Sequence, residues 1–149
     1  MASIQRFEDL KAWQSARLLA ACVYKQTRNG ELARDWAFRD QIQRSAVSVM
    51  SNIAEGFGRS GNREFLRFLY IARGSLMELK SQLYLASDME FLEPESAAEL
   101  TSHLQSTEKL LAGFIRYLED HRGFEVAEDV THHFDDRDGL QSAEFNNLS

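Results

Sequence analysis

The stretch Ser51-Asn52-Ile53-Ala54-Glu55-Gly56-Phe57-Gly58-Arg59 decides the fold of this chain. Apolar residues before it recur at helical spacing. Gly56 and Gly58 then favour an end to that helix, because glycine adopts turn conformations readily. The segment Asn62-Arg63-Glu64-Phe65-Leu66 begins a second pattern of the same period. A short connection between two long helices makes them run antiparallel, so the stretch predicts a helical hairpin.

The same spacing continues in both directions and predicts four helices, at about 8–28, 35–55, 62–87 and 94–122. Gly30 and Gly123 suit the positions just past the ends of the first and fourth helices. The third and fourth patterns alternate steps of four and three residues, which makes each of them a heptad seam. The two seams are Phe65, Leu69, Ala72, Leu76, Leu79, Leu83, Ala86 and Ala97, Leu100, Leu104, Thr107, Leu111, Phe114, Leu118.

These patterns predict an all-α fold, an up-down-up-down antiparallel four-helix bundle formed by residues 1–122. Residues 123–149 hold seven acidic residues and one arginine. Their few apolar residues bury too little surface to offset the entropy lost on ordering. We therefore expect a flexible acidic C-terminal tail there.

Charge is distributed unevenly within the bundle segment as well. Residues 1–122 carry 16 acidic and 16 basic residues and are neutral overall. Within them, residues 34–80 hold eight bases and five acids, whereas residues 88–122 hold eight acids and three bases. This segregation favours surfaces that meet charged partners or one another.

Composition narrows the class of protein. No run of about 18 apolar residues occurs, which predicts that no helix spans a membrane. The opening Met1-Ala2-Ser3-Ile4-Gln5-Arg6 lacks the apolar run of a secretory signal. Cys22 is the single cysteine, so a disulfide or a multi-thiolate metal site cannot form within one chain. We expect a cytoplasmic protein without a membrane partner.

Short motifs along the chain carry a resemblance to a known family. They are Phe7-Glu8-Asp9-Leu10, Gln41-Ile42-Gln43-Arg44-Ser45-Ala46, Ser51-Asn52-Ile53-Ala54-Glu55-Gly56, Glu64-Phe65-Leu66-Arg67-Phe68-Leu69 and Ala72-Arg73-Gly74-Ser75. Through them, residues 4–120 resemble the bacterial four-helix-bundle family of 23S rRNA-intervening-sequence proteins, which includes the accessory protein of diversity-generating retroelements. The resemblance implies a ring-shaped homopentamer without catalytic activity. Its retroelement member implies nucleic-acid binding through a basic surface.

Five polar residues of the second and third helices are candidates for one site. Ser48, Asn52 and Glu55 share one side of the second helix, and Ser75 and Glu78 share a side of the third. One interpretation is a polar pocket or a carboxylate pair for acid–base chemistry. The other, which we favour, is a buried hydrogen-bond network that fixes the register of the two helices.

Arginines of the same helices form the second candidate site, a surface for binding RNA or DNA. They are Arg39, Arg44, Arg59, Arg63, Arg67 and Arg73. The alternatives are a solvated face, or ion pairs between subunits with the acid-rich fourth helix.

Neither a catalytic set nor a cofactor or metal site is predicted. Gly56-Phe57-Gly58 follows a helix rather than a strand, so it is not a dinucleotide-binding fingerprint. The four histidines, at positions 103, 121, 132 and 133, do not pair with one another or with cysteine at helical ligand spacing. Cys22 is interpreted as a small apolar packing residue.

Apolar residues outside the seams predict association between copies of the chain. The alternative is that part of them widens the core of the bundle. They are Trp13, Trp36, Leu66, Phe68, Ile71, Leu85, Phe91, Leu110, Ile115 and Tyr117. Our first functional hypothesis is therefore a non-enzymatic, self-assembling protein, a homopentamer by resemblance. The second is a nucleic-acid-binding accessory protein that acts with structured RNA or a reverse transcriptase.

Overall fold

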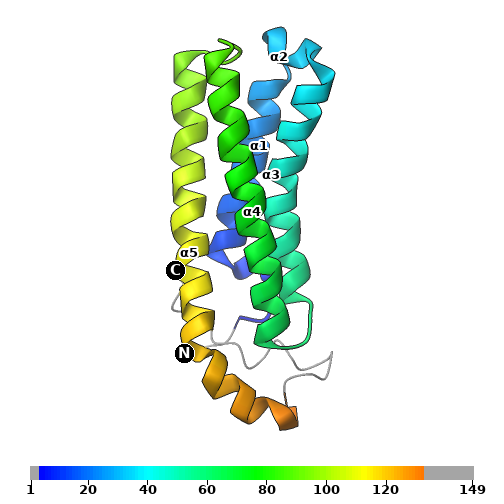
Figure 1. The fold of residues 1–149 in the computed structure, drawn as a ribbon, viewed down its shortest axis with the longest axis vertical. Helices are drawn as coiled ribbons and strands as arrows, with labels where there is room; N and C mark the ends of the chain where they lie inside the picture. Colours follow the sequence, from blue (N-terminus) through cyan, green and yellow to red (C-terminus); the bar gives the residue numbers. More distant parts are fainter. Residues whose placement is uncertain (1–3, 133–149) are drawn as a thin grey trace.

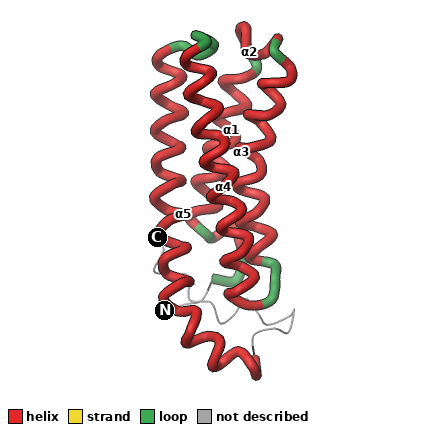
Figure 2. Tube along the Cα trace, viewed as in Figure 1, coloured by secondary structure: helices red, strands yellow, loops and turns green. Residues whose placement is uncertain are grey.

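The computed structural model describes residues 4–132, and the side chains of residues 4–121. This part of the chain is helical throughout and contains no strand (Figures 1 and 2). Its elements are the 3-10 helix η1 (Phe7–Asp9) and the α-helices α1 (Lys11–Thr27), α2 (Gly30–Arg34), α3 (Trp36–Phe57), α4 (Gly61–Asp88) and α5 (Pro94–His132).

The four long helices run alternately up and down (Figure 1), and their contacts close them into a square. Helix α1 packs against α3 and α5, and α4 packs against the same two helices from the opposite corner. Short connections hold successive helices antiparallel. The predicted all-α, up-down-up-down four-helix bundle is confirmed.

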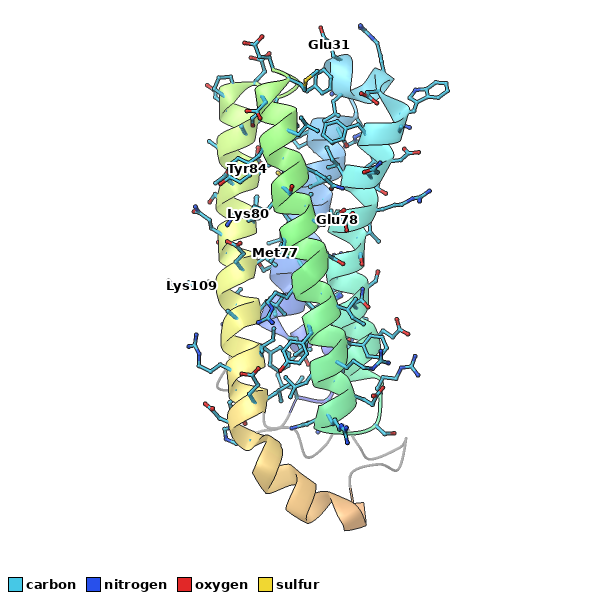
Figure 3. All side chains as sticks on the ribbon, in the orientation of Figure 1. Glu31, Met77, Glu78, Lys80, Tyr84 and Lys109 are labelled. Carbon is cyan, nitrogen blue, oxygen red and sulfur yellow. The ribbon has the colours of Figure 1, made fainter. Side chains whose placement is uncertain are left out.

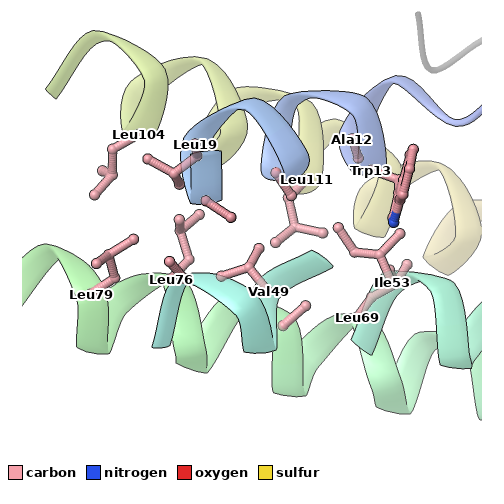
Figure 4. Close-up of a cluster of buried hydrophobic side chains, with 14 of the residues drawn as sticks. Ala12, Trp13, Leu19, Val49, Ile53, Leu69, Leu76, Leu79, Leu104 and Leu111 are labelled. Atoms are coloured by element: carbon pink, nitrogen blue, oxygen red, sulfur yellow. The ribbon is translucent and has the colours of Figure 1, made fainter. Parts of the chain in front are cut away.

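The bundle interior is filled by the predicted heptad seams. Figure 4 shows side chains of α1 and α5, such as Leu19 and Leu111, meeting Val49 of α3 and Leu76 of α4 across the interior. All members of the two seams are buried except Leu83 and Ala97, which are half-buried. Each fully buried leucine contributes about 1.5–3 kcal/mol to folding, so this interior is the main source of stability.

The hairpin between α3 and α4 forms as predicted, but its glycines act differently. Helix α3 continues through Gly56 to Phe57, and Gly58 has an ordinary φ of −79°. A Cβ atom on Gly56 would lie 2.6 Å from Cβ of Phe68, so this glycine allows α3 and α4 to approach closely. The left-handed residue of the connection is Gly61, with a φ of 79°.

Of the other two predicted helix ends, the first is confirmed and the second is wrong. Helix α1 ends at Thr27, and Gly30 after it has the expected positive φ, of 74°, although it also begins the short helix α2. Helix α5 does not stop at Gly123 but runs to His132, since a single glycine inside a helix costs only about 1 kcal/mol relative to alanine. The boundary expected at residue 122 is therefore not the end of an element, and residues 133–149 of the predicted tail lie outside the described residues.

Candidate functional site

Three of the five predicted polar residues meet between α3 and α4. The hydroxyl groups of Ser48 and Ser75 lie 2.8 Å apart and join the two helices. The Asn52 amide Nδ2 donates to the Ser48 carbonyl at 2.8 Å and to its hydroxyl at 3.0 Å. All three side chains are half-buried. The arrangement is a small hydrogen-bond network that fixes the position of one helix against the other.

The two carboxylates predicted for this network lie outside it. Glu55 is exposed and pairs with Arg59 at 2.9 Å, one helical turn further along. Glu78 is also exposed and accepts a hydrogen bond from Gln82 at 3.4 Å. The prediction that they are buried was wrong because both carboxylates lie on the exposed side of their helix, outside the leucine-rich interior. The carboxylate pair required for acid–base chemistry is therefore not assembled here.

The six predicted arginines do not share one surface. Arg39 lies near the start of α3, half-buried, where it pairs with Asp40 at 3.2 Å. Arg59 follows the end of the same helix, 20 residues later, which corresponds to about 30 Å along its axis. Arg39 and Arg44 therefore belong to one end of the bundle, while the arginines of the hairpin belong to the other.

The hairpin arginines gather around aromatic rings. The guanidinium groups of Arg59 and Arg67 lie 5.0 and 4.6 Å from the centre of the Phe68 ring. Arg67 also forms an ion pair with Glu64 at 3.2 Å, and this contact lowers the pKa of the Glu64 carboxyl group. Further along α4, Arg73 lies 5.2 Å from the centre of the Tyr70 ring.

These residues frame a hollow on the outer face of α4. It is lined by Arg63, Glu64, Leu66, Arg67 and Tyr70. The hollow offers guanidinium groups beside an aromatic ring, which is a combination suited to phosphate and nucleobase contacts. We call this set, together with Arg59 and Arg73, the arginine patch.

A second apolar stripe runs along the outside of α4. Tyr70, Gly74, Met77, Ser81 and Tyr84 follow one another at alternating steps of four and three, and all five are exposed. Met77 is 43% exposed and Tyr84 is 67% exposed. In Figure 3 both lie along the edge of α4 that borders α5. We call these five residues the outer seam.

Sequence reasoning missed the outer seam because its members are chemically different residues. Tyrosine, glycine and serine do not stand out as a heptad pattern beside the stronger leucine seam of the same helix. The usable signal was the spacing of Tyr70, Met77 and Tyr84 at multiples of seven residues. Large and small residues alternate in this seam, as they do where helices interlock.

Hollows between α4 and α5 border the outer seam. One, of about 200 Å³, is lined mainly by apolar residues of the two helices, including Leu83, Tyr84 and Leu100. A second lies beside Tyr70 and Met77. Between them, Lys80 of α4 forms an ion pair with Glu108 of α5 at 3.0 Å, which raises the pKa of Lys80.

The residues predicted as interface material divide into two groups. Trp36, Ile71 and Leu85 are exposed and remain available for association. The others are buried or packed against the interior of the same chain: Trp13, Leu66, Phe68, Phe91, Leu110, Ile115 and Tyr117. For these seven residues the alternative interpretation holds, in which they widen the core, because each helix of the bundle buries more than one narrow stripe.

Helices α1 and α5 bring together three residues with different ligand atoms. The Cys22 sulfur, a Glu99 carboxylate oxygen and a His103 ring nitrogen all lie within 4.8 Å of one another. Cys22 is only 5% exposed, and burial together with the nearby Glu99 carboxylate raises the pKa of its thiol to about 11. Sequence reasoning missed this cluster because the cysteine lies on a different helix from the other two residues.

Most of the part of the chain that the structure describes matches a known protein family. Residues 8–113 match the family described as 23S rRNA-intervening sequence protein, which is more than half of the chain. The chain belongs to this family. A comparison with curated proteins found no match.

The chain is also similar to a solved structure. This is the crystal structure of a protein with unknown function from the S23 ribosomal protein family of Bacteroides thetaiotaomicron VPI-5482. The two chains are 23% identical, the match covers 70% of this chain and 97% of the other, and the TM-score is 0.64. At this identity the likeness establishes a shared fold.

The family match contains every residue of the polar network and the outer seam, and also the cluster of Cys22, Glu99 and His103. Among the helices of residues 4–132, none has the length and apolar character that a membrane span requires.

Proposed function

We propose that the protein is a non-enzymatic, self-assembling bundle of the cytoplasm that forms a homopentamer. The observation that carries this proposal is the outer seam, because the interior of the bundle is already closed by its own leucines. Met77 and Tyr84 of the seam are exposed outside that interior, where they offer apolar surface to another copy. Five is the copy number that the family resemblance implies.

Charge supports a ring in which unlike surfaces meet. A cyclic assembly uses two different patches on each subunit. Exposed acids lie on α5, among them Glu95, Glu119 and Asp120, while the exposed arginines Arg44 and Arg63 lie on α3 and α4. Unlike charges steer two such surfaces toward each other and fix their orientation.

Solution mass measured by light scattering tests the assembly. We expect about five times the chain mass of 17.1 kDa for the native protein. Met77→Glu and Tyr84→Glu introduce charge into the outer seam without touching the interior, so both are expected to lower the mass toward that of a monomer. Asn29→Glu adds the same side chain at an exposed position before α2, outside the seam, and serves as the control. A native protein that remains a monomer at micromolar concentration contradicts the proposal.

The second candidate function, binding of structured RNA or DNA, is favoured by the arginine patch. Arg63 and Arg67 supply positive charge beside the Tyr70 ring, and Arg59 and Arg73 extend the charge to either side. Lysine and arginine contacts to phosphates supply most of the affinity of such surfaces, and aromatic rings add base stacking.

A titration with structured RNA at low and at moderate salt tests this second function. Arg63→Glu is expected to weaken binding at least tenfold and to reduce its salt dependence, since each lost phosphate contact removes one step of counterion release. Arg44→Glu makes the same charge change on an exposed residue at the other end of the bundle and is the control. Absence of affinity at low salt excludes nucleic-acid binding, and equal losses in both variants exclude the arginine patch as its site.

A further inference from the structure

We propose that Cys22, Glu99 and His103 form a binding site for a zinc-class transition metal ion. The three ligand atoms lie within 4.8 Å of one another at the contact between α1 and α5. Around a tetrahedral zinc ion, neighbouring ligand atoms are about 3.5 Å apart, given metal–ligand distances of about 2.0–2.3 Å. Glu99 is exposed and His103 is half-buried, so both side chains have room to rotate toward a shared ion.

The donor set matches zinc in kind and in charge. Thiolate sulfur, imidazole nitrogen and carboxylate oxygen are the three ligand types that zinc accepts, whereas magnesium and calcium require oxygen ligands. One thiolate and one carboxylate neutralise the two positive charges of the ion, which favours its entry into a partly buried position. Three protein ligands leave the fourth position to water, as in zinc sites that exchange a ligand.

An outer contact of the cluster holds one of its ligands in place. Gln26, one turn after Cys22 on α1, donates from Nε2 to Oε2 of Glu99 at 3.0 Å. Such outer contacts orient the first ligands of metal sites. Glu99 and His103 are four residues apart on α5, so they lie on the same side of the helix. The exposed side of Glu99 provides the path from solvent.

Metal binding at this position replaces a proton. The Cys22 sulfhydryl group loses its proton to solvent when the sulfur–metal bond forms, and His103 binds as the neutral imidazole. Because the metal ion and the proton compete for the sulfur, binding is expected to weaken as the pH falls. The ion would join the first and last helices of the bundle.

Cobalt(II) is the probe for the test, because it takes the coordination of zinc and is coloured. The full chain is titrated with cobalt chloride under reducing conditions and then with zinc chloride. We expect one equivalent per chain, a near-ultraviolet charge-transfer band that reports a thiolate ligand, visible bands of tetrahedral cobalt, and their loss when zinc displaces it. Absence of the thiolate band overturns the proposal.

Variants decide whether the bound ion sits in the cluster. Cys22→Ala and His103→Gln are expected to weaken binding at least a hundredfold, and Gln26→Ala about tenfold. His121→Gln, on the same helix and outside the cluster, is the control and is expected to bind like the native protein. Circular dichroism verifies that each variant is folded. Full affinity in folded Cys22→Ala or His103→Gln, or an equal loss in His121→Gln, overturns the assignment.

Discussion

Glu90, in the connection between α4 and α5, adopts the left-handed backbone region with a φ of 59°. The N–H groups of Glu90 and Phe91 donate to the carbonyls of Ser87 and Ala86 at 3.0 and 2.9 Å. This is the Schellman arrangement, in which glycine usually holds the left-handed position. A residue with a side chain in this conformation destabilises the folded state by about 1–2 kcal/mol. Glycine removes that cost, but it also makes the unfolded chain more flexible, which offsets part of the gain in stability.

We therefore expect Glu90→Gly to raise the free energy of unfolding by about 0.5–1 kcal/mol, measured by urea denaturation. Glu93→Gly, in the same connection but without a positive φ, is the control and is expected to leave stability unchanged or to lower it. A less stable Glu90→Gly protein would show that the carboxylate makes a compensating contact.

Gly56 provides the second prediction at the level of one residue. A Cβ atom at this position would meet the Phe68 Cβ at 2.6 Å and the Phe65 ring at 3.0 Å. Overpacking of this kind costs about 1–3 kcal/mol. We expect Gly56→Ala to lower the thermal midpoint, because the neighbour is the stem of a helical side chain and cannot move aside.

Gly113→Ala is the matched control for Gly56→Ala. Gly113 lies inside α5, and nothing is within 4 Å of an added Cβ atom. Alanine is favoured over glycine in a helix by about 1 kcal/mol, so this change is expected to raise the midpoint. Equal shifts in the two variants would contradict a close-approach role for Gly56.

The sequence shows that glycines interrupt the helices near residue 58, but it does not show what each glycine does. The cluster of Gly56, Gly58 and Gly61 predicts a hairpin, because glycine interrupts helical propensity. Which of them adopts a positive φ and which admits a neighbouring helix depends on what lies opposite. For Gly56 that neighbour is Phe68, and its position follows only from the packed structure.

At the level of elements, the hydroxyl pair of Ser48 and Ser75 couples α3 to α4. A neutral hydrogen bond contributes about 0.5–1.5 kcal/mol net. In a double-mutant cycle of Ser48→Ala and Ser75→Ala, we expect a coupling energy of about 1 kcal/mol in the free energy of unfolding. Ser81→Ala, on the exposed face of α4, replaces Ser75→Ala in the control cycle and is expected to show additivity. Additivity in both cycles would mean that the pair does not couple the helices.

The helices themselves were predictable, whereas the contacts between them were only partly so. Leucine seams fix which face of α4 and α5 turns inward, because burying that face dominates the free energy. They do not fix how far one helix is rotated or shifted against another. Ser48 and Ser75 could be predicted as neighbours because one short hairpin joins their helices. The proximity of Cys22 and His103 was missed because their helices are far apart in the sequence.

For the whole molecule, the prediction of the bundle was correct because several independent signals agree. Period, short connections and heptad seams all require the same antiparallel packing, and such agreement is typical of sequences with one stable fold. Copy number has no such signal within one chain. The outer seam indicates that a surface is available for a partner, but the angle at which two copies meet, and hence how many close a ring, depends on both patches together.

Assembly also predicts how the whole molecule melts. If unfolding separates the copies, a tenfold rise in protein concentration stabilises each chain by about 1 kcal/mol, and the thermal midpoint rises by about 2–5 °C. Met77→Glu leaves the leucine interior intact but charges the outer seam, so its midpoint is expected to be lower and independent of concentration. Comparing the two proteins separates stability that comes from assembly from stability that comes from the fold of one chain. If the outer seam stabilised only the single chain, Met77→Glu would lower the midpoint by the same amount at every concentration.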